Sequence, residues 1–231
     1  MQLFYGNITG DRFYLHESEI HHCTRVLRKD TGDVIHFITG DGNLYSGTID
    51  VVSKRSVEGF FNMEEEHWGA LPYTLTIAVA PTKNMDRFEW FIEKSIELGV
   101  SRIIPLRCDR SERKVIKEDR LFKVALSAAK QSLKGRLPKI EPLTSFKDFI
   151  AMDLEGTRCI AHCEDSERTA FSKVAQADHL VVLIGPEGDF TPNEVLAAQK
   201  AGFKPIHLGR SRLRTETAAL TAVSMVYAAH L

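Results

Sequence analysis

Two glycine-bearing segments in the last third of the chain hold the residues best suited to bind a ligand. The first, Gly185-Pro-Glu-Gly188, follows an apolar run, and the second reads Leu208-Gly-Arg-Ser-Arg-Leu-Arg214. Glycine has no Cβ, so backbone N–H and C=O groups beside it can come within hydrogen-bonding distance of a ligand. A single Gly-Pro pair is more often a plain turn. Two such segments in succession favour a binding site.

The elements around these segments are predicted to position them at one edge of a sheet. Residues 179–184 form a near-continuous apolar run, typical of a strand buried on both faces, and residues 205–208 form a second, shorter strand. Thr191 followed by Glu194 predicts a capped helix after the first loop, and Thr215 is expected to cap the helix after the second. We expect both loops to lie at the carboxyl ends of neighbouring parallel strands, where open α/β sheets bind ligands.

The rest of the C-terminal part alternates strands with helices from residue 73 onward. Strands are expected at residues 75–80, 102–106 and 158–162, and helices at 87–98 and 118–133. This alternation is typical of a mostly parallel sheet covered on both faces, an α/β fold.

The N-terminal part has a different pattern. Short β-rich runs at residues 33–39, 43–52 and 56–61, separated by glycines, predict a small antiparallel barrel. A helix is expected over residues 17–28; it either contacts phosphates or packs as an ordinary surface helix. Residues 64–72 form the expected linker. We therefore expect two domains, at residues 1–68 and 73–231.

Composition excludes several classes of protein. The 231 residues are 43% hydrophobic and 26% charged, as in ordinary soluble globular proteins. No apolar run reaches the length of a membrane span, and the N-terminus does not resemble a signal peptide. Cys159 and Cys163, with His162 between them, match no common zinc spacing. We expect no metal, no membrane, reduced thiols and a cytoplasmic location.

Charge is distributed unevenly along the chain. The formal net charge is only −1, yet residues 102–147 hold 13 Lys/Arg against 5 Asp/Glu. A polyanion would therefore be attracted to one part of the molecule. The alternative is an ordinary solvated pair of helices.

Several motifs together resemble one family, the RsmE-type 16S ribosomal RNA uridine N3-methyltransferases of the SPOUT (α/β-knot) superfamily. The similarity extends over nearly the whole chain. Its motifs are His22 with Val26-Leu27-Arg28, Lys94-Ser-Ile-Glu-Leu-Gly-Val100, Pro105 with Arg110-Ser111, Ala128-Ala-Lys-Gln-Ser132 with Pro138, Gly185-Pro-Glu-Gly188, and Leu208-Gly209 with Leu213-Arg-Thr-Glu-Thr-Ala218. The family usually has a further glycine after the first loop, where this chain has Asp189.

The resemblance implies a fold, a cofactor and partners. The fold is an N-terminal PUA-like β-barrel that binds RNA, followed by a SPOUT methyltransferase domain with a deep trefoil knot. The cofactor is S-adenosylmethionine, bound at the knot. The implied substrate is a uridine of 16S ribosomal RNA within the small subunit, and the implied assembly is a homodimer.

The resemblance also implies site residues. Backbone groups of the loops, with apolar walls, would bind the cofactor: His162, Leu183, Ile184, Gly185, Pro186, Glu187, Gly188, Leu208, Gly209, Leu213, Arg214, Thr217 and Ala218. Glu187 would contact the ribose or else cap the following helix. Phosphates of the RNA would be bound by His22, Arg25, Arg28, Arg107, Arg110, Arg113, Lys114, Lys130, Lys134 and Arg136.

Methylation at N3 needs help from the protein, because that nitrogen carries a proton and is a poor nucleophile at neutral pH. A base must take the proton, or cations must stabilise the uridine anion. Arg214 is the candidate for stabilising the anion or a flanking phosphate. Glu216 is the candidate base or Arg-orienting group, or else a plain acid at a helix N-terminus.

Two other functions remain as alternatives. A nucleotide-binding hydrolase or dehydrogenase would use a Gly-x-Gly-x-x-Gly turn or a phosphate loop, and the sequence has neither. A non-catalytic RNA-binding or ribosome-assembly factor could share the fold.

Overall fold

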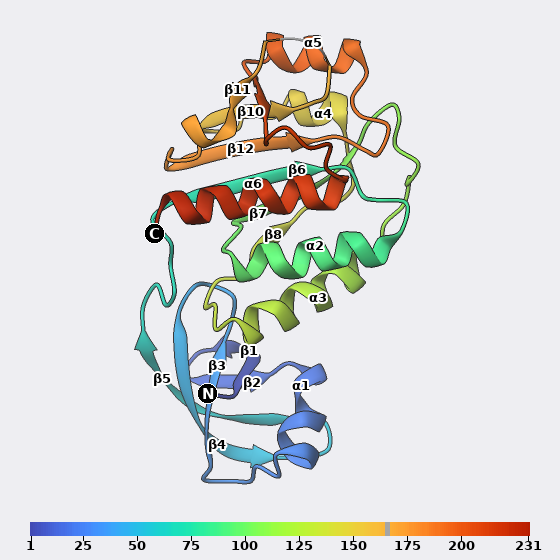
Figure 1. Ribbon diagram of the computed structural model, residues 1–231. Coiled ribbons are helices and arrows are strands. Elements are labelled where there is room, and N and C mark those ends of the chain that lie inside the picture. Colours follow the sequence, from blue (N-terminus) through green and yellow to red (C-terminus); the bar gives the residue numbers. More distant parts are fainter. Residues whose placement is uncertain (165–166) are drawn as a thin grey trace. The chain divides into compact units, whose positions relative to one another are not determined.

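The computed structural model describes residues 1–164 and 167–231, and the chain divides into two compact units (Figure 1). The first unit comprises Met1–Ala70 and Leu126–Leu137, and the second Leu71–Ala125 and Pro138–Leu231. The expected domains were residues 1–68 and 73–231. The segment Leu126–Leu137, in the middle of the sequence, groups with the first unit by its contacts.

The first unit is a closed barrel with the strand order β1-β2-β5-β4-β3. Its strands are β1 (Leu3–Thr9), β2 (Arg12–Leu15), β3 (Val34–Ile38), β4 (Leu44–Val52) and β5 (Val57–Glu65). The pattern of short runs predicted β3, β4 and β5 but not β1 and β2. The prediction of an antiparallel barrel was wrong at one seam, since β1 and β3 pair in parallel to close it.

An aromatic core fills this barrel. Phe13 and Phe37 are fully buried, with their ring centroids 5.0 Å apart. Gly47 and Gly59 face the Phe13 ring: a Cβ on Gly47 would lie 2.5 Å from it, and one on Gly59 only 1.9 Å from the Thr48 carbonyl oxygen. The glycines therefore make room for the large ring in a barrel of only five strands.

The expected helix over residues 17–28 is shorter and less regular than predicted. An α-helix, α1 (Glu17–His21), continues directly into a π-helix, η1 (His22–Val26). The segment ends where Arg28 adopts a left-handed φ of 54° and the N–H of Lys29 donates to the carbonyl of Cys23. Ile20 and Cys23 are buried in the barrel core, so packing anchors this segment.

The second unit is built on a parallel sheet. Its strands are β6 (Thr74–Val79), β7 (Arg102–Arg107), β8 (Lys139–Ile140), β9 (Thr144–Ser145), β10 (Thr157–Ala161), β11 (Thr169–Ala170), β12 (His179–Ile184) and β13 (Lys204–His207). The order is β11-β13-β10-β12-β6-β7-β8, with β9 paired to β7, and each recorded pairing is parallel. The expectation that β12 and β13 are neighbours was wrong, because β10 lies between them.

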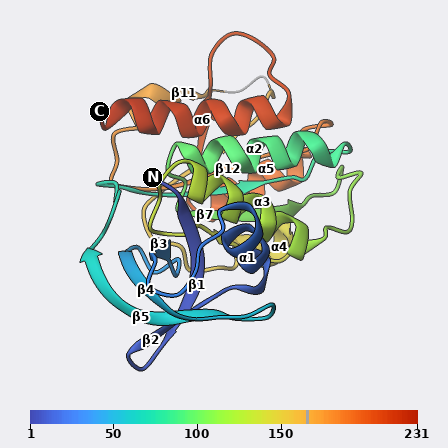
Figure 2. The same cartoon turned by 90° about the horizontal axis from the view of Figure 1, so that it is seen from below.

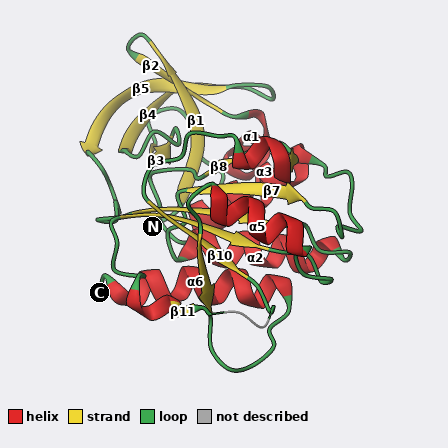
Figure 3. Ribbon diagram, turned by 90° about the horizontal axis from the view of Figure 1, so that it is seen from above, coloured by secondary structure: helices red, strands yellow, loops and turns green. Residues whose placement is uncertain are grey.

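Helices cover both faces of this sheet. The helical segments are α2 (Met85–Glu97), α3 (Glu118–Gln131), α4 (Phe146–Ile150), η2 (Phe171–Lys173), α5 (Pro192–Lys200) and α6 (Thr215–Ala229). The division between the two units falls within α3. Helices α4 and α5 pack in one core cluster with alternate residues of β6, β7, β10 and β12. Helices α2 and α6 run side by side, and α6 contacts β6 and β12 (Figures 2 and 3).

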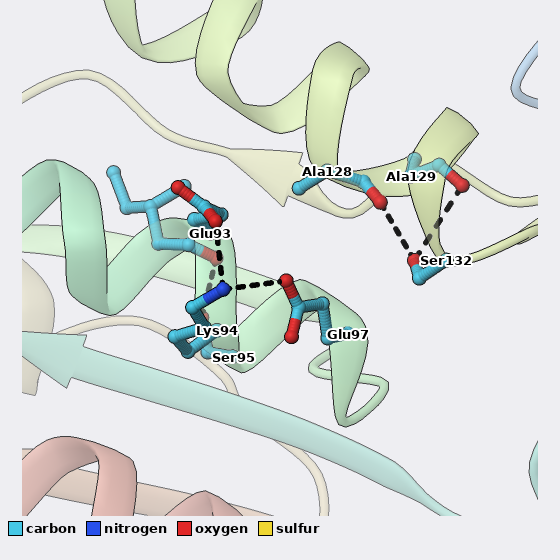
Figure 4. Close-up of polar contacts among 8 residues, drawn as sticks. Glu93, Lys94, Ser95, Glu97, Ala128, Ala129 and Ser132 are labelled. Carbon is cyan, nitrogen blue, oxygen red and sulfur yellow. Dashed lines mark hydrogen bonds and ion pairs between the residues drawn. The ribbon is translucent and has the colours of Figure 1, made fainter.

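Two of the motif segments have polar contacts within their own helices (Figure 4). On α2, the ammonium of Lys94 lies 2.7 Å from a carboxylate oxygen of Glu93 and 2.9 Å from one of Glu97. At the end of α3, the hydroxyl of Ser132 donates to the carbonyl of Ala128 at 2.7 Å. These contacts order the helices.

Candidate active site

Three loops meet at the carboxyl edge of the sheet and enclose a cavity of about 450 Å³. They follow β10, β12 and β13, whose ends are level because Ala161 pairs with both Ile184 and Ile206. The size falls within the range of small-molecule sites, about 300–1,000 Å³. The loop after β10 is therefore as central to the cavity as the two glycine loops.

The loop after β12 is a tight turn that folds back on itself. The N–H of Asp189 donates to the carbonyl of Pro186 at 2.9 Å. A Cβ on Gly185 would lie 3.1 Å from the ring of Phe190, closer than most packed side chains allow. Phe190 is buried in the core cluster between the sheet and helices α4 and α5, and this packing anchors the turn.

Asp189 joins the first loop to the loop after β10. Its carboxylate accepts from the N–H of Cys163 and from the N–H of Phe190, both at 2.8 Å. Its φ of 64° is left-handed, a conformation that Asp tolerates better than most residues with a side chain. The resembled family usually has glycine at this position. Asp189 thus keeps the turn and adds a hydrogen bond that connects two walls of the cavity.

His162 is a buried polar group without a partner. It is 4% exposed, it lines the cavity, and neither ring nitrogen makes a hydrogen bond to any residue that the structure describes. Burial lowers the pKa of this imidazole from 6.5, against the attraction of Asp189. A neutral imidazole carries one donor and one acceptor. Leaving both unpaired in the interior is costly, so this group points to a ligand.

Thr215 and Glu187 do not cap the helices that follow the two glycine loops. Thr215 does not cap α6: Arg214 is the N-cap residue, and the Thr215 hydroxyl instead donates to the Gly185 carbonyl at 3.1 Å. Glu187 does not cap α5, whose capping box consists of Thr191 and Glu194. Glu187 accepts from the N–H of Lys83 at 2.9 Å.

The cavity mouth carries both charged candidates and a cation that the sequence analysis missed. Arg214 is exposed at the N-cap of α6, while Glu216, two residues later in the first turn, is only 8% exposed. An oxygen of Glu216 lies 3.9 Å from Nε of Arg87, on the first turn of α2. Arg87, Glu216 and Arg214 all line the cavity. The arrangement can present positive charge to an anion beside a shielded carboxylate.

Most of the predicted cofactor residues line this cavity, and three do not. Those that do are His162, Ile184, Gly185, Pro186, Glu187, Leu208, Gly209, Leu213, Arg214 and Ala218. Leu183 instead packs in the core beneath α4 and α5, because successive side chains of a strand point to opposite faces. Gly188 and Thr217 are exposed outside the lining.

The lining also includes residues that sequence reasoning did not name as site residues: Arg87, Ala161, Arg168, Asp189, Ile206, His207, Ser211, Arg212 and Thr215. Ala161 and Ile206 line the cavity because they lie at or next to the ends of strands β10 and β13, which pair in parallel. Arg87 had no local signal, since a helix 127 positions before Arg214 supplies it.

The predicted phosphate-binding residues do not form one set. Arg110 donates to the carbonyls of Gly188 and Phe190, and Arg113 to that of Lys83, so both support loops. Lys130 pairs with Glu19 at 2.6 Å within the first unit, whereas Arg107 and Lys114 are exposed in the second. The remaining five also belong to the first unit: His22, Arg25, Arg28, Lys134 and Arg136.

Among the described residues, none of the helices has the length and apolar character needed to cross a membrane. Likewise, residues 1–164 and 167–231 contain no group of three or more His, Cys, Asp or Glu side chains arranged to hold a metal ion.

Comparison with known proteins agrees with this architecture. Residues 70–227 match the family model of the RNA methyltransferase domain, and residues 15–61 that of the RNA methyltransferase PUA domain. Ribosomal RNA small subunit methyltransferase E of Bacillus subtilis is 30% identical, over 95% of this chain and 88% of that protein.

Two solved structures have the same fold over nearly their whole length. One, described as a probable rRNA-methyltransferase from Porphyromonas gingivalis, has a TM-score of 0.88 and 35% identity, covering 100% of this chain and 98% of that one. The other is a Ribosomal RNA small subunit methyltransferase E from Neisseria gonorrhoeae bound to S-adenosyl methionine, with a TM-score of 0.80 and 28% identity, covering 97% and 95%. The chain therefore belongs to the RNA methyltransferase family that includes ribosomal RNA small subunit methyltransferase E.

Proposed function

We propose that this protein transfers a methyl group from S-adenosylmethionine to N3 of a uridine in 16S ribosomal RNA of the small subunit. The observation that carries the proposal is the three-loop cavity with the buried His162 in its wall, whose ring nitrogens bond to none of the residues described. The relatives support it, since the related Neisseria gonorrhoeae enzyme was solved with S-adenosyl methionine bound.

The residues around the cavity fit this cofactor. A neutral His162 offers a donor and an acceptor to its polar groups, while Ile184, Leu208 and Leu213 offer apolar surface. The glycine loops offer backbone groups at close range. The cofactor, when bound, supplies a methyl group activated by a sulfonium sulfur.

The charged residues at the mouth act on the uridine. As the N3–methyl bond forms and the sulfur–methyl bond breaks, N3 must lose its proton. Arg214 stabilises the negative charge that the base develops, and Glu216, held near Arg87, accepts the proton. S-adenosylhomocysteine and the methylated RNA are then released. The target base must leave any stack to reach a donor in this cavity.

The proposal extends to the assembly and location. The N-terminal domain, predicted as residues 1–68, binds RNA, and the protein works in the cytoplasm as a homodimer. After β13 the chain returns to pack α6 against β6 and β12, which is the kind of path that the family's trefoil knot requires. We propose the knot on that basis.

Arg214→Ala tests the catalytic assignment. Loss of one group that stabilises a developing anion typically costs about 10²–10³ in turnover. We expect a drop of that size in single-turnover methylation of small-subunit ribosomal RNA at saturating S-adenosylmethionine, with unchanged thermal stability. Arg210→Ala is the matched control, because Arg210 is exposed in the same loop but does not line the cavity. A wild-type rate for Arg214→Ala would remove Arg214 from the mechanism.

Calorimetry separates the enzyme from its alternatives. We expect binding of S-adenosylmethionine and no binding of ATP or NAD. A protein that binds ribosomal RNA but neither binds S-adenosylmethionine nor transfers its methyl group would instead be a ribosome-assembly factor on the same fold.

A further inference from the structure

A second cavity, of about 490 Å³, lies within the first unit. One wall is the α1–η1 segment, which contributes Glu17, His21, Thr24 and Arg25. The other is the turn between β4 and β5, which contributes Lys54 and Arg55. We refer to this cavity as the α1–turn groove. Its walls come from segments about thirty positions apart in the sequence, so no local motif reveals it.

The groove contains three cationic side chains that make no contribution to the fold through hydrogen bonds or ion pairs with the residues that the structure describes. Arg25, Lys54 and Arg55 are exposed, and their side chains make no hydrogen bond or ion pair with any residue in the described part of the chain. Three of the six other cations of the same unit are paired: Arg12 with Asp50 and Glu58, Lys29 with Asp33, and Lys130 with Glu19. Glu17 is the only acid in the groove's lining as described.

Hydrogen bonds order the backbone of both walls. The hydroxyl oxygen of Ser53 accepts from the N–H of Arg55 at 3.1 Å and of Ser56 at 2.9 Å, which orders the turn. On the other wall, the N–H of Leu27 donates to the carbonyl of His22 at 3.0 Å, the wide spacing of a π-helix. Short π-helices are frequent at functional sites.

The rest of this unit is acidic. Its two segments, residues 1–70 and 126–137, hold 9 Lys/Arg against 11 Asp/Glu; outside the groove, 6 Lys/Arg remain against 10 Asp/Glu. A polyanion approaching this part of the chain would therefore be attracted to the groove and repelled by most of the remaining surface. Arginine and lysine together suit phosphate, since the guanidinium binds it through two parallel hydrogen bonds.

We infer that the α1–turn groove binds backbone phosphates of the RNA substrate, through Arg25, Lys54 and Arg55. This rests on the proposed function for the identity of the polyanion. It adds Lys54 and Arg55 to the predicted RNA-binding residues. Of the predicted RNA-binding residues on this segment, Arg25 lines the groove and His22 does not. The His22 ring lies against Phe4, and its Nε2 is 3.3 Å from the side-chain nitrogen of Gln2.

The test is the salt dependence of RNA binding by the full-length Lys54→Gln/Arg55→Gln variant. Filter binding with transcribed small-subunit ribosomal RNA, from about 50 to about 200 mM salt, gives the slope of log affinity against log salt. Each lost phosphate contact lowers the steepness of that slope by about 0.7–0.9, so we expect a decrease of about 1.4–1.8. The loss of affinity between those two salt concentrations should then be about tenfold smaller than in the wild type.

The matched control is Lys200→Gln/Lys204→Gln, which removes two positive charges at exposed positions outside the groove, on α5 and at the amino end of β13. We expect it to keep the wild-type slope. An unchanged slope for the groove variant, or an equal change in the control, would overturn the inference.

Methyl transfer is measured separately on the same proteins. With the groove variant we expect a raised KM for RNA and an unchanged kcat. Normal methylation together with unaltered RNA binding would refute the groove and leave the proposed function intact. RNA binding that depends on Lys54 and Arg55 in a protein that transfers no methyl group would support the groove and refute the enzyme.

Discussion

Substitution of Asp189 is expected to loosen the cofactor cavity without unfolding the protein. Its carboxylate joins the loop after β12 to the loop after β10 through the N–H of Cys163, and also accepts from the N–H of Phe190. The backbone is left-handed at this position. Asparagine, glycine and alanine therefore remove different parts of the arrangement, which allows the contributions to be separated.

The size of each effect follows from these contacts. A hydrogen bond to a charged group contributes about 1.5–3 kcal/mol, and we take the lower end because Asp189 is only half-buried. Glycine keeps the backbone conformation but loses the tie, so cofactor affinity should fall about tenfold, since about 1.4 kcal/mol corresponds to that factor. Alanine adds about 1–2 kcal/mol of left-handed strain. Asparagine retains one acceptor and should have the smallest effect.

Calorimetric titration with S-adenosylmethionine measures the affinities, and thermal unfolding followed by circular dichroism measures stability. We expect affinity to decrease in the order Asp, Asn, Gly, Ala, with glycine reducing affinity more than stability. Asp153→Gly is the control, because Asp153 is fully exposed elsewhere in the same unit. If Asp189→Ala bound the cofactor as tightly as the wild type, the carboxylate tie would have no role in ordering the cavity.

Two further predictions concern the loop after β10. Burial lowers the pKa of His162 below 6.5, so the unfolded chain binds a proton at this residue more readily than the folded chain does. The contribution of His162 to the free energy of unfolding is therefore fully present above pH 6.5 and is lost as the pH falls through the lowered pKa. Urea unfolding should show a larger loss between neutral and mildly acidic pH for the wild type than for His162→Gln, and equal losses would contradict the assignment. The second concerns the thiols: Cys163 is exposed and lines the cavity, whereas Cys23, Cys108 and Cys159 are buried, with burial raising the pKa of each. Iodoacetamide with mass spectrometry should therefore modify Cys163 first, and S-adenosylmethionine should slow that reaction; labelling unaffected by the cofactor would place the cofactor elsewhere.

Local patterns were sufficient for much of the second unit. The strand at β12 coincides with the predicted apolar run, and α5 has the predicted cap at Thr191 with Glu194. Helix α2 ends as expected before Gly99, whose φ is 84°. Each of these signals depends on residues within one element or its immediate flanks, so the sequence contains all the information required.

Predictions that needed longer-range information were less accurate. Thr215 has the residue type of an N-cap, but its hydroxyl bonds to Gly185, thirty positions earlier. The strands β1 and β2 were missed, because the glycine and polar residues of β1 weaken its alternation and only pairing within the barrel stabilises it. In both cases a tertiary contact outweighed the local preference.

By itself the sequence determined the two kinds of secondary-structure pattern, the glycine loops, the candidate pair Arg214 and Glu216, and the resemblance to an RNA methyltransferase family. Only the tertiary structure decided that β10 lies between β12 and β13, that Asp189 ties two loops together, and that Arg87 stands beside Glu216. The reason is physical: periodicity and capping depend on neighbours within a few residues, whereas strand order and the walls of a cavity depend on contacts between residues far apart in the chain.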